Sequence, residues 1–339
     1  VDHVISIFQQ NNIDVHVVVG HRQKEVRMAV KSRDIRIIEN PDYEQGMFAS
    51  VQAGVRNLGL AYEYFFIMPV DIPLVRPETI ARLLSEIEKY PDKIVYPVFD
   101  GRRGHPPLIP SSLIPSILTG NEDGGLKAAL SANSGAAHEL VVPDSNILYD
   151  VDTPEDYQEL LKRFQRIQIP TVPECEAILD DICRVAPDIR QHSMKVAEVA
   201  VRMGEVLNKH SRKVDVEAIQ AAAMLHDIAK GQPEHDAEGG RVLRGMGFGY
   251  IGDIVAVHTD LGDDDTQFSM ESKIVYLADK LVIGRNLVRI EERFQSANNR
   301  FATTPEIEAN IAIRKARALR VKQELELQMG CPLESIISK

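Results

Sequence analysis

The second half of the sequence carries histidine and aspartate side chains in an order suited to holding metal ions. These residues are His192, His226, Asp227, His235, His258 and Asp279. Imidazole nitrogen and carboxylate oxygen suit manganese, iron, nickel or zinc, and the adjacent pair at 226 and 227 can supply one terminal ligand and one bridging carboxylate. A bound ion lowers the pKa of its water toward neutrality and makes hydroxide available. We therefore expect a site for one or two divalent transition metal ions.

Any one of these histidines alone could be an ordinary core or surface residue. The group as a whole favours metal binding, because its members lie on or beside apolar, helix-forming segments where solvated polar residues are not expected. Lys230 closes the run Leu225-His226-Asp227-Ile228-Ala229-Lys230. It is either a cation that meets a substrate phosphate or an ordinary cation at a helix end.

This run and its distant partners resemble the HD-domain metal-dependent phosphohydrolases over about residues 183–287. The resemblance implies that His226, Asp227 and Lys230 are catalytic and that Lys230 and Arg285 meet substrate phosphate. It also implies the ligands of a first ion, which are His192, His226, Asp227 and Asp279. His235 and His258 are similar to the ligands that the two-metal subgroup adds.

The segment 276–285 resembles the closing segment of bacterial HD enzymes that split diadenosine tetraphosphate. The short gap from Asp227 to His235 departs from those enzymes, so their substrate is not carried over.

Two carboxylates in the first half could hold a magnesium ion. Asp71 ends a predicted buried strand, and ligands of open α/β sheets bind at the carboxyl ends of strands. Mg²⁺ prefers hard oxygen ligands that it shares with phosphates. Asp152 precedes a predicted helix with Pro154 in its first turn and could be a second carboxylate on the same ion. The alternative is that Asp152 or Thr153 only caps that helix.

A glycine-containing loop around Gly46 opens a predicted helix near Ser50, whose hydroxyl can cap it. Free N–H groups at a helix N-terminus bind the polar atoms of nucleotides well. Together with the segments 101–108 and 123–127, these features resemble the molybdenum cofactor cytidylyltransferases (the MobA-like NTP transferases) over residues 1 to about 164.

That resemblance implies attack by a phosphate of molybdopterin on the α-phosphate of CTP, with release of pyrophosphate. Asp71 and Asp152 would hold Mg²⁺, Gly46 and Ser50 would lie near the base, and the cofactor side would be lined by Gly104 and His105. The family opens with a strand and a Gly-rich loop that grips the triphosphate, and nothing before Val1 supplies them. We therefore expect this chain to transfer nucleotides poorly or not at all.

The elements that position these residues fall into two classes. Strand-like runs at 15–19, 35–38, 64–68, 94–98 and 139–142 alternate with helical patterns at 50–58, 77–89 and 154–164. This alternation predicts an α/β domain over 1–166, a Rossmann-like nucleotidyltransferase with a three-layer sheet. Residues 167–173 lose the apolar period and carry Pro170 and Pro173, which predicts a linker.

The remainder, 174–339, is predicted to be an all-α HD bundle. Helices are expected at 174–186, 190–208, 216–229, 237–246, 251–258, 269–282 and about 305–329. The last and longest helix either packs on the bundle or faces another subunit, and the second alternative would make the protein a homo-oligomer.

Composition narrows the function classes. The 339 residues favour two domains, and the net charge of -11 argues against binding nucleic acid through a basic surface. Three cysteines give neither a disulfide framework nor a thiolate zinc site. No apolar run is long enough to span a membrane, and no signal segment opens the chain, so we expect a cytoplasmic protein.

The leading interpretation is a bifunctional enzyme of molybdenum cofactor or nucleotide metabolism, with small-molecule substrates. It would join a nucleotidyltransferase to a metal-dependent HD hydrolase. A second hypothesis makes the α/β half a nucleotide- or cofactor-sensing module that regulates the HD half. A third treats the chain as a binding protein with a degraded metal site.

Overall fold

The computed structural model describes residues 1–31, 34–59, 61–120, 124–131, 137–210, 213–262 and 264–337. Asp123, which belongs to one of the cytidylyltransferase-like segments, lies outside them. The chain divides into two compact units, Val1–Gln165 and Arg166–Lys339. Within the described ranges, no helix is long and apolar enough to cross a membrane.

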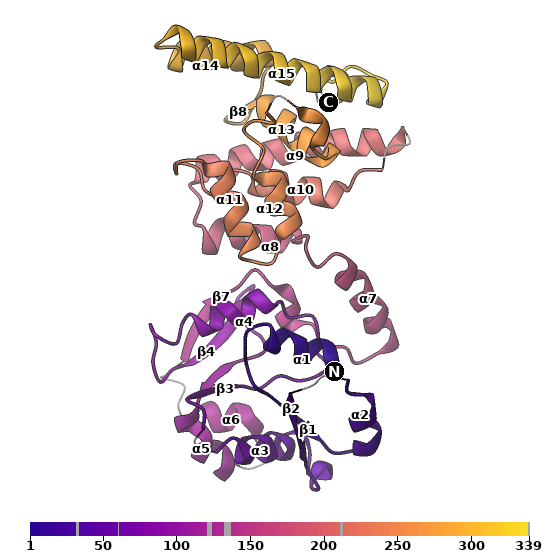
Figure 1. Ribbon diagram of the computed structural model, residues 1–339, viewed down its shortest axis with the longest axis vertical. Helices are drawn as coiled ribbons and strands as arrows, with labels where there is room; N and C mark the ends of the chain where they lie inside the picture. Colours follow the sequence, from indigo (N-terminus) through magenta and orange to yellow (C-terminus); the bar gives the residue numbers. More distant parts are fainter. Residues whose placement is uncertain are drawn as a thin grey trace. The chain divides into compact units, whose positions relative to one another are not determined.

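The first unit alternates helices with strands (Figure 1). Its helices are α1 (Asp2–Gln9), α2 (Gln23–Ala29), α3 (Met47–Leu58), α4 (Pro77–Leu84), α5 (Ile114–Thr119), α6 (Gly125–Ser131) and α7 (Pro154–Gln165). Its strands are β1 (Val15–Val19), β2 (Ile35–Glu39), β3 (Tyr64–Phe66), β4 (Ile94–Phe99), β5 (Arg102–Arg103), β6 (Leu108–Pro110) and β7 (Ala137–Val141).

The strands of the first unit form two sheets. β1 and β2 pair in parallel, with Val15 opposite Ile35. β3, β6, β4 and β5 follow one another in a second sheet, in which β7 runs parallel to β4. In the described part of the chain, no strand pairs with both β1 and β3, so the α/β layer expected as one sheet lies in two pieces. Its core joins α3, α5 and α6 to the second sheet through Phe48, Phe65, Ile94, Ile109 and Ile117.

The second unit is mainly helical. Its helices are α8 (Val172–Ala177), α9 (Pro187–Lys209), α10 (Val216–Leu225), α11 (His235–Arg244), α12 (Gly249–Val255), α13 (Met270–Lys280), α14 (Ile290–Phe301), α15 (Pro305–Met329) and α16 (Glu334–Ile337). A π-helical segment (Ile178–Ile182) follows α8. A small hairpin of β8 (Val282–Ile283) and β9 (Asn286–Leu287) follows α13.

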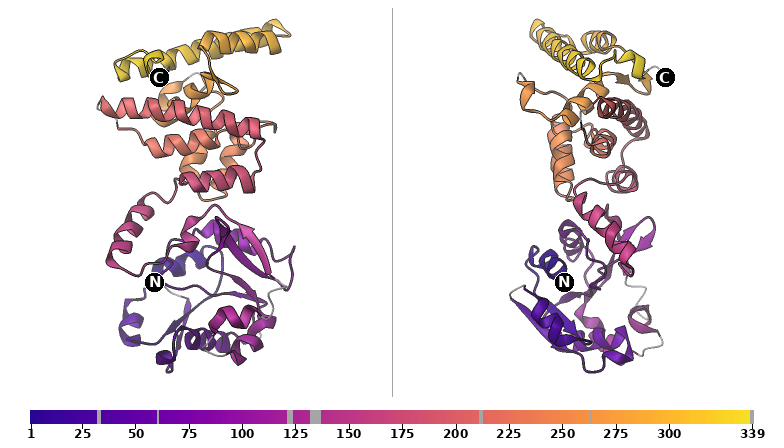
Figure 2. Two further views of the ribbon diagram at one scale, coloured as in Figure 1. Left: turned by 180° about the vertical axis from the view of Figure 1, so that it is seen from behind. Right: turned by 90° about the vertical axis from the view of Figure 1, so that its right-hand side faces the viewer.

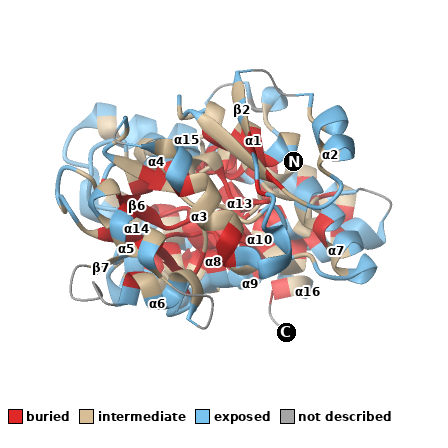
Figure 3. Cartoon of the chain, turned by 90° about the horizontal axis from the view of Figure 1, so that it is seen from below, coloured by how far each residue is buried: buried red, intermediate tan, exposed pale blue. Residues whose placement is uncertain are grey.

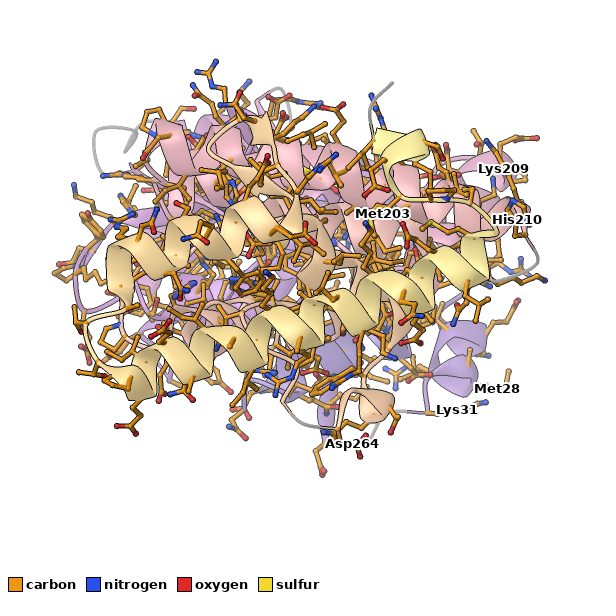
Figure 4. The ribbon with its side chains drawn as sticks, turned by 90° about the horizontal axis from the view of Figure 1, so that it is seen from above. Met28, Lys31, Met203, Lys209, His210 and Asp264 are labelled. Carbon is orange, nitrogen blue, oxygen red and sulfur yellow. The ribbon has the colours of Figure 1, made fainter. Side chains whose placement is uncertain are left out.

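Two helices form the centre of this unit. α10 packs against α9, α12 and α13, and every residue of α13 from Ser272 to Lys280 is buried. Figure 3 shows the buried residues of α10 and α13 in red. α14 and α15 lie side by side, as Figure 2 and Figure 4 both show.

Three differences between the sequence-based element predictions and the structure of the second unit bear on the candidate site. The helix expected over 174–186 is broken, because a π-helical segment replaces its second half. The helix expected over 216–229 ends at Leu225, so the adjacent histidine and aspartate lie in the turns that follow it. α14 was not predicted at all.

Residues 167–173, expected as a linker, are counted with the second unit. Thr171 caps α8 there: its hydroxyl accepts the backbone N–H of Glu174, and the Glu174 carboxylate accepts the N–H of Thr171.

Candidate metal centre

Ends of four helices, together with α9, bring the predicted ligands of the second unit together. His192 lies on α9, and His226 and Asp227 directly follow α10. The others are His235 at the start of α11, His258 three residues beyond α12 and Asp279 in the last turn of α13. Side chains at helix ends can turn toward a common point without interrupting the buried helix faces that hold the unit together.

Asp227 is the centre of the cluster. Its Oδ2 lies 3.4 Å from Nε2 of His226 and 4.0 Å from Nε2 of His192. Its Oδ1 lies 3.4 Å from Nε2 of both His235 and His258. The two carboxylate oxygens therefore face two different pairs of imidazoles, as a carboxylate that bridges two ions would.

The same division appears in the groups of ligand atoms that converge. Among the described residues, one group consists of His192, His226 and Asp227, and the other of Asp227, His235 and His258. Asp279 adds to the first group, because its Oδ1 lies 3.1 Å from Nε2 of His192 and 3.8 Å from Nε2 of His226.

Backbone carbonyls fix the orientation of three of the imidazoles. Nδ1–H of His226 donates to Ala223 O, Nδ1–H of His258 to Val255 O, and Nδ1–H of His192 to Gly284 O. A neutral imidazole that donates through Nδ1 presents the lone pair of Nε2 to the carboxylates. Nε2 of His192 lies 3.1 Å from Oδ1 of Asp279, so a proton or a metal ion must lie between these two atoms. Metal-binding histidines are oriented by hydrogen bonds of this kind.

The residues present fit a metal ion. Nε2 of His226 and of His235 is buried and has no hydrogen-bond partner, and the atoms that they face are carboxylate oxygens, which accept but do not donate. Lone pairs that face lone pairs in a buried site need a shared cation, either a proton or a metal ion. A set of imidazole nitrogens and carboxylate oxygens suits divalent transition metals.

Electrostatics within the cluster favour a charged state. Burial opposes ionisation of Asp227 and of Asp279, but neighbouring imidazoles and, at Asp279, the Lys280 ammonium hold the pKa of both carboxyls below the usual range. Burial acts on His226 too, but Asp227 and Asp279 outweigh it and raise the pKa of its imidazole. Burial lowers the pKa of His258.

Lysine and arginine side chains surround the cluster. Nζ of Lys230 lies 3.1 Å from Oδ2 of Asp227, and its side chain is 44% exposed. Arg285 lies in the turn of the β8–β9 hairpin, and its Nε donates to Oε1 of Gln191. Among the described residues, no hydrogen bond or ion pair joins Arg285 to Asp227 or Asp279, so its expected phosphate role stays a prediction.

Two further residues at the cluster had no role in the sequence analysis. Nζ of Lys280 donates to Oδ2 of Asp279 at 2.8 Å and to His258 O at 3.1 Å. Lys280 thereby occupies the second oxygen of Asp279 and leaves Oδ1 to the imidazoles. Arg293 on α14 lies 3.7 Å from that Oδ1. Lys280 follows Asp279 directly in the sequence, whereas nothing near Arg293 in the sequence points to the cluster.

The candidate site in the first unit is more open. The N–H of Val151 donates to Asp71 O at 2.9 Å, which brings Asp71 beside the residue that precedes Asp152. Both aspartates are exposed. Burial lowers the pKa of His105, and Asp71 and Asp150 are close enough to oppose that shift. Within the described residues of this unit, no three metal-ligating side chains converge.

The structure contradicts the predicted capping role of Ser50 and shows why glycine occupies positions 46 and 104. Ser50 does not cap α3, because the helix begins at Met47 and Gly46 is its N-cap residue. The Ser50 hydroxyl instead accepts a hydrogen bond from Nδ2 of Asn40. Gly46 has φ of 112°, which favours glycine. Gly104 is buried, and a Cβ there would lie 2.6 Å from Ile147 O, so a close backbone contact requires glycine at this position.

The capping alternative for the start of α7 is also visible. Oγ1 of Thr153 accepts the N–H of Asp156, and the carboxylate of Asp156 accepts the N–H of Thr153 and of Asp152. Thr153 therefore performs the cap, and the carboxylate of Asp152 is not required for it.

Parts of both units match known protein families. Residues 1–138 match the family of the MobA-like NTP transferase domain, and residues 189–283 match the HD domain family. The molybdenum cofactor cytidylyltransferase of Escherichia coli K12 is 28% identical over 153 residues, which are 44% of this chain and 76% of that protein.

Solved structures that are similar to this chain include two of one mycobacterial protein. Rv0371c from Mycobacterium tuberculosis H37Rv is 22% identical with a TM-score of 0.42, over 47% of this chain and 81% of that chain. The complex of the same protein with manganese is 21% identical with a TM-score of 0.41, over 47% of this chain and 84% of that chain.

Proposed function

We propose that this chain, which joins a MobA-like NTP transferase domain to an HD domain, hydrolyses a nucleotide or another phosphate ester in its HD half with bound divalent metal ions. The observation that carries this proposal is the setting of Asp227, whose two oxygens face separate pairs of imidazoles in a buried cluster. Phosphohydrolysis is the chemistry that such a donor set, flanked by a half-exposed lysine, serves best.

The residues of the cluster would divide between two metal ions and the substrate phosphate. His192, His226 and Asp279 would hold a first ion, His235 and His258 a second, and Asp227 would touch both. Ions held there would supply a water of lowered pKa and neutralise phosphate oxygens. Lys230 would bind a non-bridging phosphate oxygen next to Asp227, because its ammonium is close to that carboxylate and still reaches solvent.

Lys280 would keep the centre in its binding geometry. By donating to Oδ2 of Asp279 and to the carbonyl of His258, it ties together residues from two elements of the centre. His226, Asp227, His258 and Asp279 are buried, and keeping bulk water away from them strengthens electrostatic contacts to a phosphate.

A phosphohydrolase screen tests this function. The full chain is incubated with nucleotides and dinucleotides in the presence of Mn²⁺, Ni²⁺, Fe²⁺ or Zn²⁺, beside the variant His226→Ala. The matched control is His210→Ala, which removes an exposed histidine at the end of α9 (Figure 4). We expect metal-dependent hydrolysis in the wild type and in His210→Ala, and its loss in His226→Ala. Absence of hydrolysis from the wild type in every arm would refute the proposal.

We further propose that the α/β half binds a nucleotide with Mg²⁺ at Asp71 and Asp152. The hydrogen bond from Val151 to Asp71, which places these carboxylates on neighbouring backbone segments, favours this. The finer function has two forms. In one, this half transfers the cytidylyl group of CTP to molybdopterin. In the other, it senses a nucleotide or cofactor and regulates the HD half.

Two assays separate these forms. Transfer predicts release of pyrophosphate from CTP in the presence of molybdopterin, and Asp71→Asn would abolish it. Sensing predicts CTP or cofactor binding without turnover, together with a change in the rate of hydrolysis by the HD half. If neither ligand binds, the proposed nucleotide site is wrong.

A further inference from the structure

Arg293 belongs to a helix that is anchored beside the metal centre. On α14, Ile290 and Phe294 are buried. Residues three and four apart share one face of a helix, so Arg293, three residues after Ile290, lies on the side that faces the unit. Its side chain is 30% exposed, which leaves it accessible to a ligand.

The guanidinium of Arg293 lies at the carboxylate that completes the first group of ligands. One nitrogen lies 3.7 Å from Oδ1 of Asp279, and another donates to Val282 O at 3.3 Å. A distance of 3.7 Å is too long for a hydrogen bond. The oxygen concerned is the one that faces His192 and His226.

Asp279 does not need this second cation. Lys280 is buried and donates to Oδ2 of Asp279 at 2.8 Å, so the charge of the carboxylate already has a close partner. A guanidinium has five N–H donors in a planar fork that matches phosphate oxygens. The position of Arg293, near the ligands but not in hydrogen-bond contact with them, suits a ligand that is anionic and binds beside the ion.

We propose that Arg293 binds a non-bridging oxygen of the substrate phosphate, on the side of the centre where Asp279 lies. Lys230 is the corresponding cation at Asp227. The inference deepens the proposed hydrolase function and rests on it. The charge of Arg293 attracts phosphate but repels the metal ion. Its removal should therefore weaken phosphate binding without weakening metal binding.

The variant Arg293→Gln tests this, with Arg300→Gln as the matched control. Arg300 is an exposed arginine on the same helix, next to the ring of Phe301. Calorimetry measures binding of inorganic phosphate to the full chain loaded with Mn²⁺, and a separate titration measures Mn²⁺ binding. Where a hydrolysed substrate is known, KM and kcat are measured as well.

We expect Arg293→Gln to bind phosphate about 10- to 100-fold more weakly, since a charge-assisted hydrogen bond is lost. Its Mn²⁺ affinity should be equal or higher, and KM should rise. The phosphate affinity of Arg293→Lys should lie between those of the wild type and Arg293→Gln, because a lysine keeps the charge but lacks the planar guanidinium. Arg300→Gln should match the wild type.

Unchanged phosphate binding in Arg293→Gln would overturn the inference. Parallel losses of phosphate binding, Mn²⁺ binding and thermal stability would overturn it too, because they would show a structural role. Failure of the proposed function looks different: the wild type would then hydrolyse nothing, while phosphate binding would still report on Arg293.

Discussion

The two candidate sites of this chain represent opposite ways of presenting carboxylates. Asp227 is 2% exposed and lies among four imidazoles, three of which are oriented by contacts with backbone carbonyls. Asp71 and Asp152 are exposed, and a backbone hydrogen bond brings their segments together. The first arrangement is prepared before any ligand arrives, whereas the second depends on what binds.

The two sites therefore obtain their binding energy from different sources. Burying a carboxylate is costly unless it is paired, so the surroundings of Asp227 must offset that cost even without a ligand. Exposed aspartates keep their hydration and cost little, but they hold an ion only weakly until a nucleotide adds its own oxygens. Four predictions test whether the two sites differ in this way.

The largest effect is expected at the carboxylate shared by both groups of imidazoles. Asp227→Asn removes the charge and one of the two oxygens, so metal-dependent hydrolysis should fall by more than about a hundredfold, since loss of groups that only orient ligands costs about 10–100-fold. Initial rates at saturating metal measure it. Asp253→Asn, at an exposed aspartate of the same unit paired with Arg244, is the control. Equal rates for the two variants would remove Asp227 from the mechanism.

The second prediction concerns a buried carboxylate with a structural role. Asp144 is paired with Arg76 at 2.7 Å and also accepts from Thr79, and all three side chains are buried. Asp144→Ala removes the carboxylate that faces the buried Arg76 guanidinium and should destabilise the first unit by about 3–5 kcal/mol.

Calorimetric unfolding of the full chain checks this, with the exposed Asp150→Ala as control. Metal content and hydrolysis should stay unchanged in Asp144→Ala at temperatures where it is folded. Loss of bound metal from the folded variant would contradict the division of roles between the two units.

The third prediction concerns metal removal. Because buried acceptors face one another around Asp227, the folded second unit should bind an ion that the unfolded chain does not, and free metal at about 100 times the dissociation constant should stabilise it by about 2.7 kcal/mol. Thermal unfolding of chelator-treated protein, before and after addition of Mn²⁺, measures the shift. Asp71→Asn should show the same shift as the wild type. An unchanged unfolding temperature in the wild type would mean that the cluster is filled by protons instead.

The smallest effect is expected when the exposed carboxylates of the first unit are changed and hydrolysis by the second unit is measured. Asp71→Asn should change hydrolysis by less than about twofold in the absence of nucleotide, because Asp71 belongs to the first unit and all six expected metal ligands belong to the second. Rates of the variant and the wild type, with and without CTP, check it. A strong loss without nucleotide would break the comparison, since it would make Asp71 part of the hydrolytic machinery.

The sequence predicted best those features that long patterns or residue types determine. The range 305–329 was expected to be helical and is α15, because its period extends over many turns and Thr304 and Gly330 mark its ends. Both domain families were identified from their motifs, and the comparisons confirm them. The structure also brings together all six residues expected at the metal centre, although their role as ligands stays a proposal.

Features that depend on other elements could not be predicted. α14 has few apolar residues, and its helix forms where Ile290 and Phe294 are buried by neighbours that the local sequence does not reveal. The capping role of Ser50 was wrong because the loop at Gly46 starts α3 three residues earlier than expected. Arg293 received no role because its neighbour Asp279 lies on another helix. Lys280 received none although Asp279 directly precedes it, because its contact with His258 O depends on how the fold brings His258 to α13.

Metal content tests the central claim most directly. The full chain, incubated with Mn²⁺, Fe²⁺, Ni²⁺ or Zn²⁺ and desalted, is analysed by elemental mass spectrometry beside His192→Ala, His235→Ala and His210→Ala. The account predicts about two ions per chain in the wild type and in His210→Ala, and about one in each of the other variants, because Asp227 joins two separate ligand groups. Wild-type protein that retains less than about one ion under every condition would contradict it.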